Sequence, residues 1–87
     1  MSNKSFKSLA KEAIDYTEKG ISLLVEVNVL QQALKNLPKS ENNESLISEI
    51  IEKEKIAVNF IHQATIIERA LMKKQHDLIE EMLSNLS

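Results

Sequence analysis

Residues 44–86, ESLISEIIEKEKIAVNFIHQATIIERALMKKQHDLIEEMLSNL, decide the fold because they contain no Gly and no Pro. Apolar residues recur in this stretch at the three- and four-residue steps of one helix face. They form two neighbouring columns, with Ile47, Ile50, Ala57, Ile61, Ala64, Leu71, Leu78 and Met82 in the first and Ile51, Val58, Thr65, Met72, Ile79 and Leu86 in the second. Two adjacent columns make a wide apolar face, which predicts a core helix. One helix of this length would extend roughly 60 Å, so it needs a partner of comparable length.

The N-terminal part of the chain supplies a partner helix. An apolar repeat with alternating steps of three and four residues runs through Phe6, Leu9, Ala13, Tyr16, Gly20, Leu23, Val27, Leu30, Leu34 and Leu37. This spacing is typical of a coiled coil. Only Gly20 contributes no side chain, and the repeat keeps its phase across it. We therefore expect another helix to pack closely at Gly20.

The segment Pro38-Lys-Ser-Glu-Asn-Asn is the turn between the two helices. Pro38 disfavours a helical conformation in the residue before it, and Ser40 or Asn43 would cap the second helix. A short connection joins antiparallel neighbours. The sequence predicts one all-α domain over residues 1–87, a long antiparallel helical hairpin with helix 1 at about 5–36, a turn at 37–43 and helix 2 at about 44–86. In this hairpin Leu30 faces Ile51, and Leu23 faces Val58.

The C-terminal end of helix 2 has no partner on helix 1. The apolar residues concerned are Leu78, Ile79, Met82, Leu83 and Leu86. Either they pack against another subunit, or the chain bends near 74–77 and a short third helix folds back. Asp77 followed by Glu80 has the spacing of a capping motif, so the bend stands as an equal alternative to the contact with another subunit.

Further apolar residues predict self-association. Helix 2 carries an additional apolar flank, and helix 1 is apolar nearly all round between Ile21 and Leu30. An isolated monomer rarely exposes a continuous patch of this kind. We therefore expect a homo-oligomeric helix bundle, a dimer or higher, whose interface contains Val25, Val29, Ile56, Phe60, Ile67, Leu78 and Met82.

Composition limits the location and partners of the protein. The 87 residues carry a formal net charge of −2 and no Cys, so no disulfide or thiolate metal site is possible. Neither half forms a basic stripe, which argues against general nucleic-acid binding. The richest apolar run, 21–30, is interrupted by Ser22, Glu26 and Asn28, and the N-terminus lacks the apolar region of a signal peptide. We expect a cytoplasmic protein that does not enter a membrane.

Three polar residues interrupt the apolar face of helix 2, namely Glu54, Glu68 and Gln75. Buried carboxylates need partners, so these residues are candidates for ligand binding. Alternatively, they specify the register of helix pairing. Tyr16 is expected near Thr65 and Glu68, where its hydroxyl could satisfy the carboxylate. It completes the set of polar core or ligand candidates.

The sequence contains no motif that supports an enzymatic activity, a cofactor or a metal site. Glu49 with Glu52, and Asp77 with Glu80, resemble the acidic pairs of the all-α nucleoside triphosphate pyrophosphatases. The second pair departs from that family's ExxD order. A carboxylate-metal pyrophosphatase is kept as a further alternative. His62 and His76 have no partner at metal-binding spacing.

Residues 37–61, LPKSENNESLISEIIEKEKIAVNFI, resemble the helical hairpin of phage sponges that act against CBASS and Thoeris immunity. The shared elements are a Leu-Pro-x-Ser turn, then Ser45-Leu46, and an apolar-Glu pair at Ile51-Glu52. The family's Trp is missing, and Glu54-Lys55 stand where apolar residues are expected. The resemblance implies a small all-α oligomer that sequesters a signalling nucleotide between subunits, held by Lys or Arg and stacked on Tyr16 or Phe6.

Beside the remote pyrophosphatase alternative, two functions remain. The first is a non-enzymatic helical homo-oligomer that binds and sequesters a partner as a regulatory, immunity or chaperone-like module. The second is a phage-type sponge for a cyclic-nucleotide immune signal. The partner is a protein in the first case and a small signalling nucleotide in the second.

Overall fold

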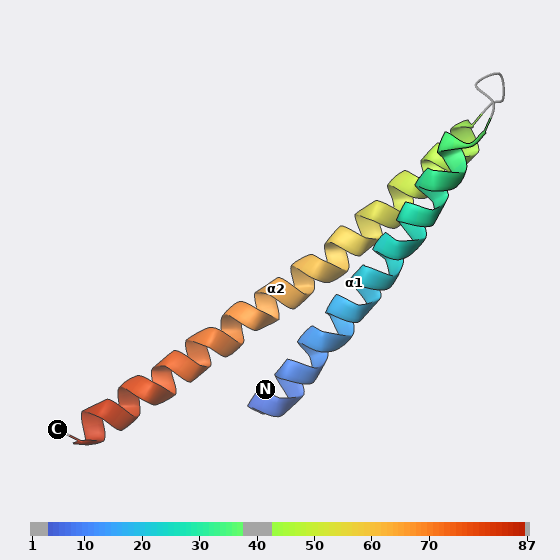
Figure 1. Cartoon of the computed structure of the whole chain (residues 1–87). Coiled ribbons are helices and arrows are strands. Elements are labelled where there is room, and N and C mark those ends of the chain that lie inside the picture. Colours follow the sequence, from blue (N-terminus) through green and yellow to red (C-terminus); the bar gives the residue numbers. More distant parts are fainter. Residues whose placement is uncertain (1–3, 38–42, 87) are drawn as a thin grey trace.

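The computed structural model describes residues 4–37 and 43–86 and shows two antiparallel helices that form a hairpin (Figure 1). Helix α1 spans Phe6–Lys35 and helix α2 spans Glu44–Leu86. The molecule is elongated, with extents of 73 × 26 × 14 Å. The prediction of an all-α helical hairpin is confirmed. Because α2 is longer than α1, its C-terminal end continues past the N-terminus of α1 (Figure 1).

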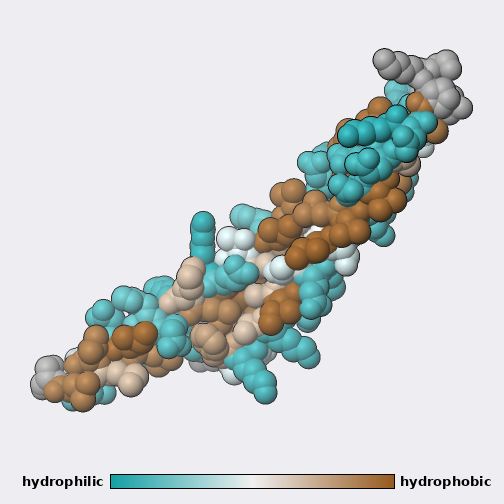
Figure 2. All heavy atoms as spheres, viewed as in Figure 1, coloured by the Kyte–Doolittle hydropathy of each residue, from teal (hydrophilic) through white to brown (hydrophobic). Residues whose placement is uncertain are grey.

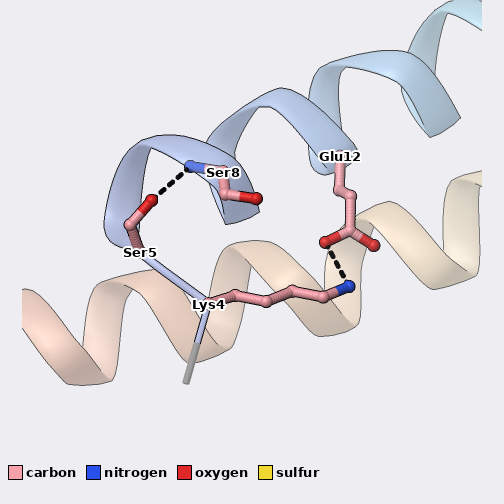
Figure 3. A network of polar contacts seen from close by, with 4 residues as sticks. All are labelled: Lys4, Ser5, Ser8 and Glu12. Carbon is pink, nitrogen blue, oxygen red and sulfur yellow. Dashed lines mark hydrogen bonds and ion pairs between the residues drawn. The ribbon is translucent and has the colours of Figure 1, made fainter. Parts of the chain in front are cut away.

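Helix α1 begins at a side-chain cap. The hydroxyl oxygen of Ser5 accepts a hydrogen bond from the backbone N–H of Ser8 at 3.1 Å, as a Ser N-cap is expected to do (Figure 3). Beside this cap, the ammonium group of Lys4 lies 2.7 Å from a carboxylate oxygen of Glu12. At the other end, the backbone N–H of Asn36 donates to the carbonyl oxygens of the last turn. Pro38 and Ser40 lie outside the described residues.

Helix α2 begins after Asn43, whose backbone carbonyl accepts the N–H of Ile47 at 2.9 Å. Glu44 lies in the first turn, where a negative charge interacts favourably with the helix dipole. From there α2 runs for 43 residues without interruption. The alternative of a bend near residues 74–77 with a short third helix is therefore wrong. The segment contains no Gly or Pro to end the helix, so the helix continues.

The core of the hairpin is a narrow seam of small residues. The buried positions recur every seven residues and are Ala13, Gly20 and Val27 on α1, and Ile50, Ala57 and Ala64 on α2. An ideal Cβ atom built on Gly20 would lie 2.6 Å from Cγ1 of Ile61 and 3.2 Å from the carbonyl oxygen of Ala57. The predicted close approach of a second helix at Gly20 is thus confirmed.

The seam of α2 differs from the prediction. Half-buried residues flank the buried ones mainly on one side, and they are Leu46, Lys53, Phe60 and Ile67. Among the described residues on the other side, only Ile61 and Thr65 are half-buried. The predicted second column is exposed apart from Thr65; Ile51 is 50% exposed and Val58 is 57% exposed. The prediction that this column packs against α1 is wrong. Because Ala57 and Ala64 face α1, the two backbones come close enough to leave that column outside the contact.

Candidate interaction surface

The main feature outside the core is an apolar stripe along the whole of α2. Its residues are spaced alternately by three and four, so they lie along one side of the helix. We define the α2 stripe as Ile47, Ile51, Glu54, Val58, Ile61, Thr65, Glu68, Met72, Gln75, Ile79, Met82 and Leu86. Its apolar members are exposed, except for the half-buried Ile61 and Thr65. Because α1 covers the core seam of α2, most of a second seam with the same periodicity stays exposed.

Helix α1 adds apolar side chains on the same side of the hairpin. Ile61 of the α2 stripe packs against Gly20, which lies between Ile14 and Ile21 of α1. A hollow joins Glu68 of the stripe to Ile14 and Thr17 of α1. We define the apolar face as the α2 stripe together with Ile14, Ile21 and Leu24, which are 57%, 52% and 39% exposed. Figure 2 shows hydrophobic side chains gathered along the paired helices and over the C-terminal end of α2.

The other side of the hairpin carries charge and the aromatic contacts. Lys53 of α2 lies 3.3 Å from the carboxylate of Glu26 on α1. The ring of Phe60 lies 6.0 Å from that of Tyr16, and the ammonium of Lys19 lies 5.7 Å from the centre of the Phe60 ring. These cross-helix contacts stabilise the hairpin itself. The two sides of the molecule therefore differ in character, one apolar and one charged.

The interface residues predicted from the sequence are distributed over both sides. Phe60 and Ile67 are half-buried and belong to the seam between α1 and α2. Val25 and Val29 are exposed and line a hollow with Glu26, Glu49 and Lys53 on the charged side. Ile56 is 41% exposed and lies one helical turn before Phe60 in α2. Leu78 and Met82 are exposed at the C-terminal end of α2.

The polar candidates are not brought together. Glu54, Glu68 and Gln75 are all exposed in the single chain, and they lie at different positions along the α2 stripe. Tyr16 is half-buried, and its ring contacts Phe60 on the charged side. Glu68 instead lines the hollow on the apolar side. No hydrogen bond joins Tyr16 to Glu68, so the expected pairing of these two described residues is not formed.

The described residues contain no group of three or more His, Asp or Glu side chains that could hold a metal ion. The two acidic pairs lie on one continuous helix, 28 residues apart, which corresponds to about 40 Å. His76 lies 3.6 Å from Glu80, and both side chains are exposed. Over the same part of the chain, neither helix has an apolar stretch long enough to cross a bilayer.

A hollow of about 470 Å³ lies on the charged side. It is lined by Asp15, Glu18, Lys19, Ser22, Leu23, Glu26 and Phe60. Three carboxylates oppose one ammonium group there, so the hollow does not favour an anionic ligand. Its volume suits a small molecule, but it is a shallow depression between side chains and not an enclosed cavity.

No known protein family, curated protein or solved structure matches this chain. The site is therefore described by its own residues alone. Sequence reasoning missed that Phe60 and Ile67 belong to the seam between α1 and α2. The available signal was the small residues Ala57 and Ala64, because seven-residue spacing of small side chains marks the side where two helices approach closely.

Proposed function

We propose that this chain is a non-enzymatic helical protein that self-associates into a bundle and acts by binding and sequestering a partner. The apolar face is the observation that carries the proposal. Exposed apolar side chains that line one side of a molecule mark an interaction site, even where single polar residues stand between them. The patch follows heptad spacing along the full length of α2, which is the pattern of a surface that receives other helices.

The total exposed surface supports the same proposal. The chain exposes 7076 Å², whereas a compact monomer of this mass exposes roughly 5,200 Å². None of the large side chains among the described residues is fully buried. A single hairpin therefore buries little apolar surface, and association with further helices would supply the missing core.

The separation of the polar groups favours binding over catalysis. A carboxylate-metal pyrophosphatase needs its acidic pairs around one metal centre. In this chain the pair Glu49–Glu52 and the pair Asp77–Glu80 lie about 40 Å apart along α2. The carboxylates within reach of one another line open hollows, where water competes for any cation.

A cyclic-nucleotide sponge is the alternative suggested by residues 37–61. A phosphate ligand needs several cationic or N–H donors around it. Within one chain, the hollow on the charged side offers Lys19 as its single cationic group among three carboxylates. A nucleotide would therefore have to bind at a site completed by a second subunit, and the sponge also depends on self-association.

The absolute mass of the protein in solution tests this proposal. Light scattering over a dilution series should give a mass of two or more chains that does not fall on dilution to low micromolar concentration. A mass of one chain throughout would contradict the proposal. Cyclic dinucleotides and cyclic ADP-ribose isomers are then added to the oligomer. A rise in its melting temperature would assign the sponge function, and no rise would leave a protein partner.

A further inference from the structure

We propose that a second copy of this chain covers the apolar face, with the two α2 helices antiparallel across a two-fold axis close to residues 66 and 67. This inference rests on the proposed self-association and specifies its geometry. The occupant of the face is thus another copy of the same hairpin, and the product is a two-chain bundle.

The length of the α2 stripe identifies its partner. The stripe runs from Ile47 to Leu86, roughly 60 Å. Helix α1 has 30 residues, and its buried side is already occupied by the core seam. Within this chain, only the α2 stripe itself has the length and the periodicity to match. Two copies of α2 can therefore cover each other from end to end.

One antiparallel register uses the whole α2 stripe. In this register Ile47 of one copy lies opposite Leu86 of the other, and Ile51 lies opposite Met82. Towards the two-fold axis, Ile61 lies opposite Met72. Every apolar member of the stripe then has a stripe residue opposite it, because the three- and four-residue steps coincide when the direction is reversed.

The polar members of the α2 stripe select the antiparallel direction. In a parallel in-register pair, Glu54 and Glu68 would each lie opposite the same residue of the other copy. Two like charges brought together at an apolar contact destabilise it. In the antiparallel register, Glu68 lies opposite the hydroxyl-bearing Thr65 close to the axis. The two Glu54 carboxylates are then 25 residues apart along the helix direction, about 38 Å, so the antiparallel register removes that like-charge pair. The two Glu68 side chains stay three residues apart across the axis, each opposite a Thr65 hydroxyl.

In the same register, the C-terminal end of α2 packs against the other copy. Residues 72–86 extend past α1, and their apolar side chains are exposed, including Leu78 at 45% and Leu86 at 83%. In the antiparallel pair this end lies over the turn-proximal half of the other α2. There it also meets the α1 residues of the apolar face, Ile21 and Leu24. The bundle has four helices at its centre and three at each end.

The area to be covered agrees with a permanent dimer. The chain exposes 7076 Å², roughly 1,900 Å² more than a compact monomer of its mass. Standard interfaces bury about 800 Å² on each partner, and obligate homodimers bury more. The excess exceeds what a standard interface buries on each partner, as expected if one isologous contact along the apolar face closes the dimer.

Spin labels on single cysteines test the direction of the pair. The chain has no native Cys, so one substitution gives one label per subunit. Glu52 and Ile66 are exposed and lie two heptads apart on the same side of α2, away from the α2 stripe. Pulsed dipolar spectroscopy on Glu52→Cys and on Ile66→Cys measures the distance between equivalent labels. The mass of each labelled protein is measured in parallel.

The two distances distinguish the possible arrangements. In the antiparallel pair the Ile66→Cys labels lie near the axis, and the Glu52→Cys labels are separated by about 44 Å along the helix direction. A Glu52→Cys distance at least 20 Å longer than the Ile66→Cys distance is the expected result. Equal distances in a two-chain species would overturn the antiparallel arrangement while leaving self-association intact. A one-chain mass with no dipolar coupling would overturn both, and a mass above two chains would overturn the two-copy bundle.

Discussion

The backbone of Gly20 packs directly against Ile61, because a Cβ atom at Gly20 would lie only 2.6 Å from Cγ1 of that side chain. The same Cβ would lie 3.2 Å from the carbonyl oxygen of Ala57, which is 0% exposed. The two helices approach closely at this point of the seam between α1 and α2. With Ala57 and Ile61 turned toward α1, the rest of the α2 stripe lies outside the hairpin, except for the half-buried Thr65.

Gly20→Ala should lower the free energy of unfolding by about 1 kcal/mol. The better helix propensity of Ala contributes about 1 kcal/mol in its favour, but overpacking costs typically 1–3 kcal/mol. Chemical denaturation at fixed protein concentration measures the difference. Ser22→Ala, an exposed substitution in the same helix, is the control and should be neutral or slightly stabilising. A stabilised Gly20→Ala variant would show that the helices do not approach closely there.

Ser5→Ala should lower the free energy of unfolding by about 1 kcal/mol, because the N–H of Ser8 loses the hydroxyl oxygen that accepts it at 3.1 Å. Ser8→Ala keeps that N–H and is the matched control, with little expected effect. Thermal unfolding followed by circular dichroism measures both variants. Equal melting temperatures for the two would mean that Ser5 does not cap α1 in solution.

Phe60→Ala should lower the free energy of unfolding by about 2 kcal/mol, roughly half the usual loss for a fully buried Phe. Phe60 is half-buried and contacts Tyr16 with 6.0 Å between ring centres. Phe6→Ala removes a ring that is 42% exposed and serves as the control, with a smaller loss. If both variants lost equally little, Phe60 would not belong to the seam between α1 and α2.

The double substitution Glu54→Leu with Glu68→Leu should tighten the dimer by roughly tenfold or more, because apolar side chains replace carboxylates on the α2 stripe. It should also relax the choice of direction, since no like charges then oppose a parallel pair. Spin labels at Glu52→Cys should accordingly report a second, short distance. A single long distance in the double variant would show that other residues set the direction.

The fold was largely predictable from the sequence, and α1 shows why. Its apolar residues form one unbroken repeat, so its buried side could be assigned, and Ala13 and Val27 are buried as expected. The end of α1 also follows from the turn residues near Pro38. The continuity of α2 through residues 74–77 follows from the lack of a helix breaker, although the capping motif at Asp77 left a bend as an equal alternative.

The orientation of α2 was harder to predict, because its sequence contains two seams of the same periodicity. Ile50 and Ala57 belong to one, and Ile51 and Val58 belong to the other. Hydrophobicity alone does not show which of the two seams faces α1. The larger side chains are in the second seam. At Gly20 the missing side chain makes room for Ile61 and for the backbone of Ala57, so the Ala57 seam faces α1. Phe60 and Ile67 lie beside that seam and are therefore half-buried between the two helices.

The apolar face could be found only once this orientation was known. Sequence reasoning correctly indicated that more apolar surface exists than a two-helix hairpin can hide. It placed part of that surface at Val25 and Val29, which lie beside Glu26 and Lys53 on the charged side. The uncovered seam instead runs through Ile51 and its neighbours. In the proposed dimer this seam is covered by a second copy, whose position a single sequence does not record.

Self-association through the apolar face is tested most directly by comparing Ile51→Gln with Ile66→Gln. The two Ile side chains are 50% and 49% exposed in the single chain, but only Ile51 belongs to the α2 stripe. Sedimentation equilibrium over a dilution series should give a dissociation constant for Ile51→Gln roughly a hundredfold above that of the unmodified chain, since two Ile side chains leave each interface. Ile66→Gln should stay within about threefold. Equal dissociation constants for the two variants, or a stronger effect of Ile66→Gln, would contradict the assignment of this face.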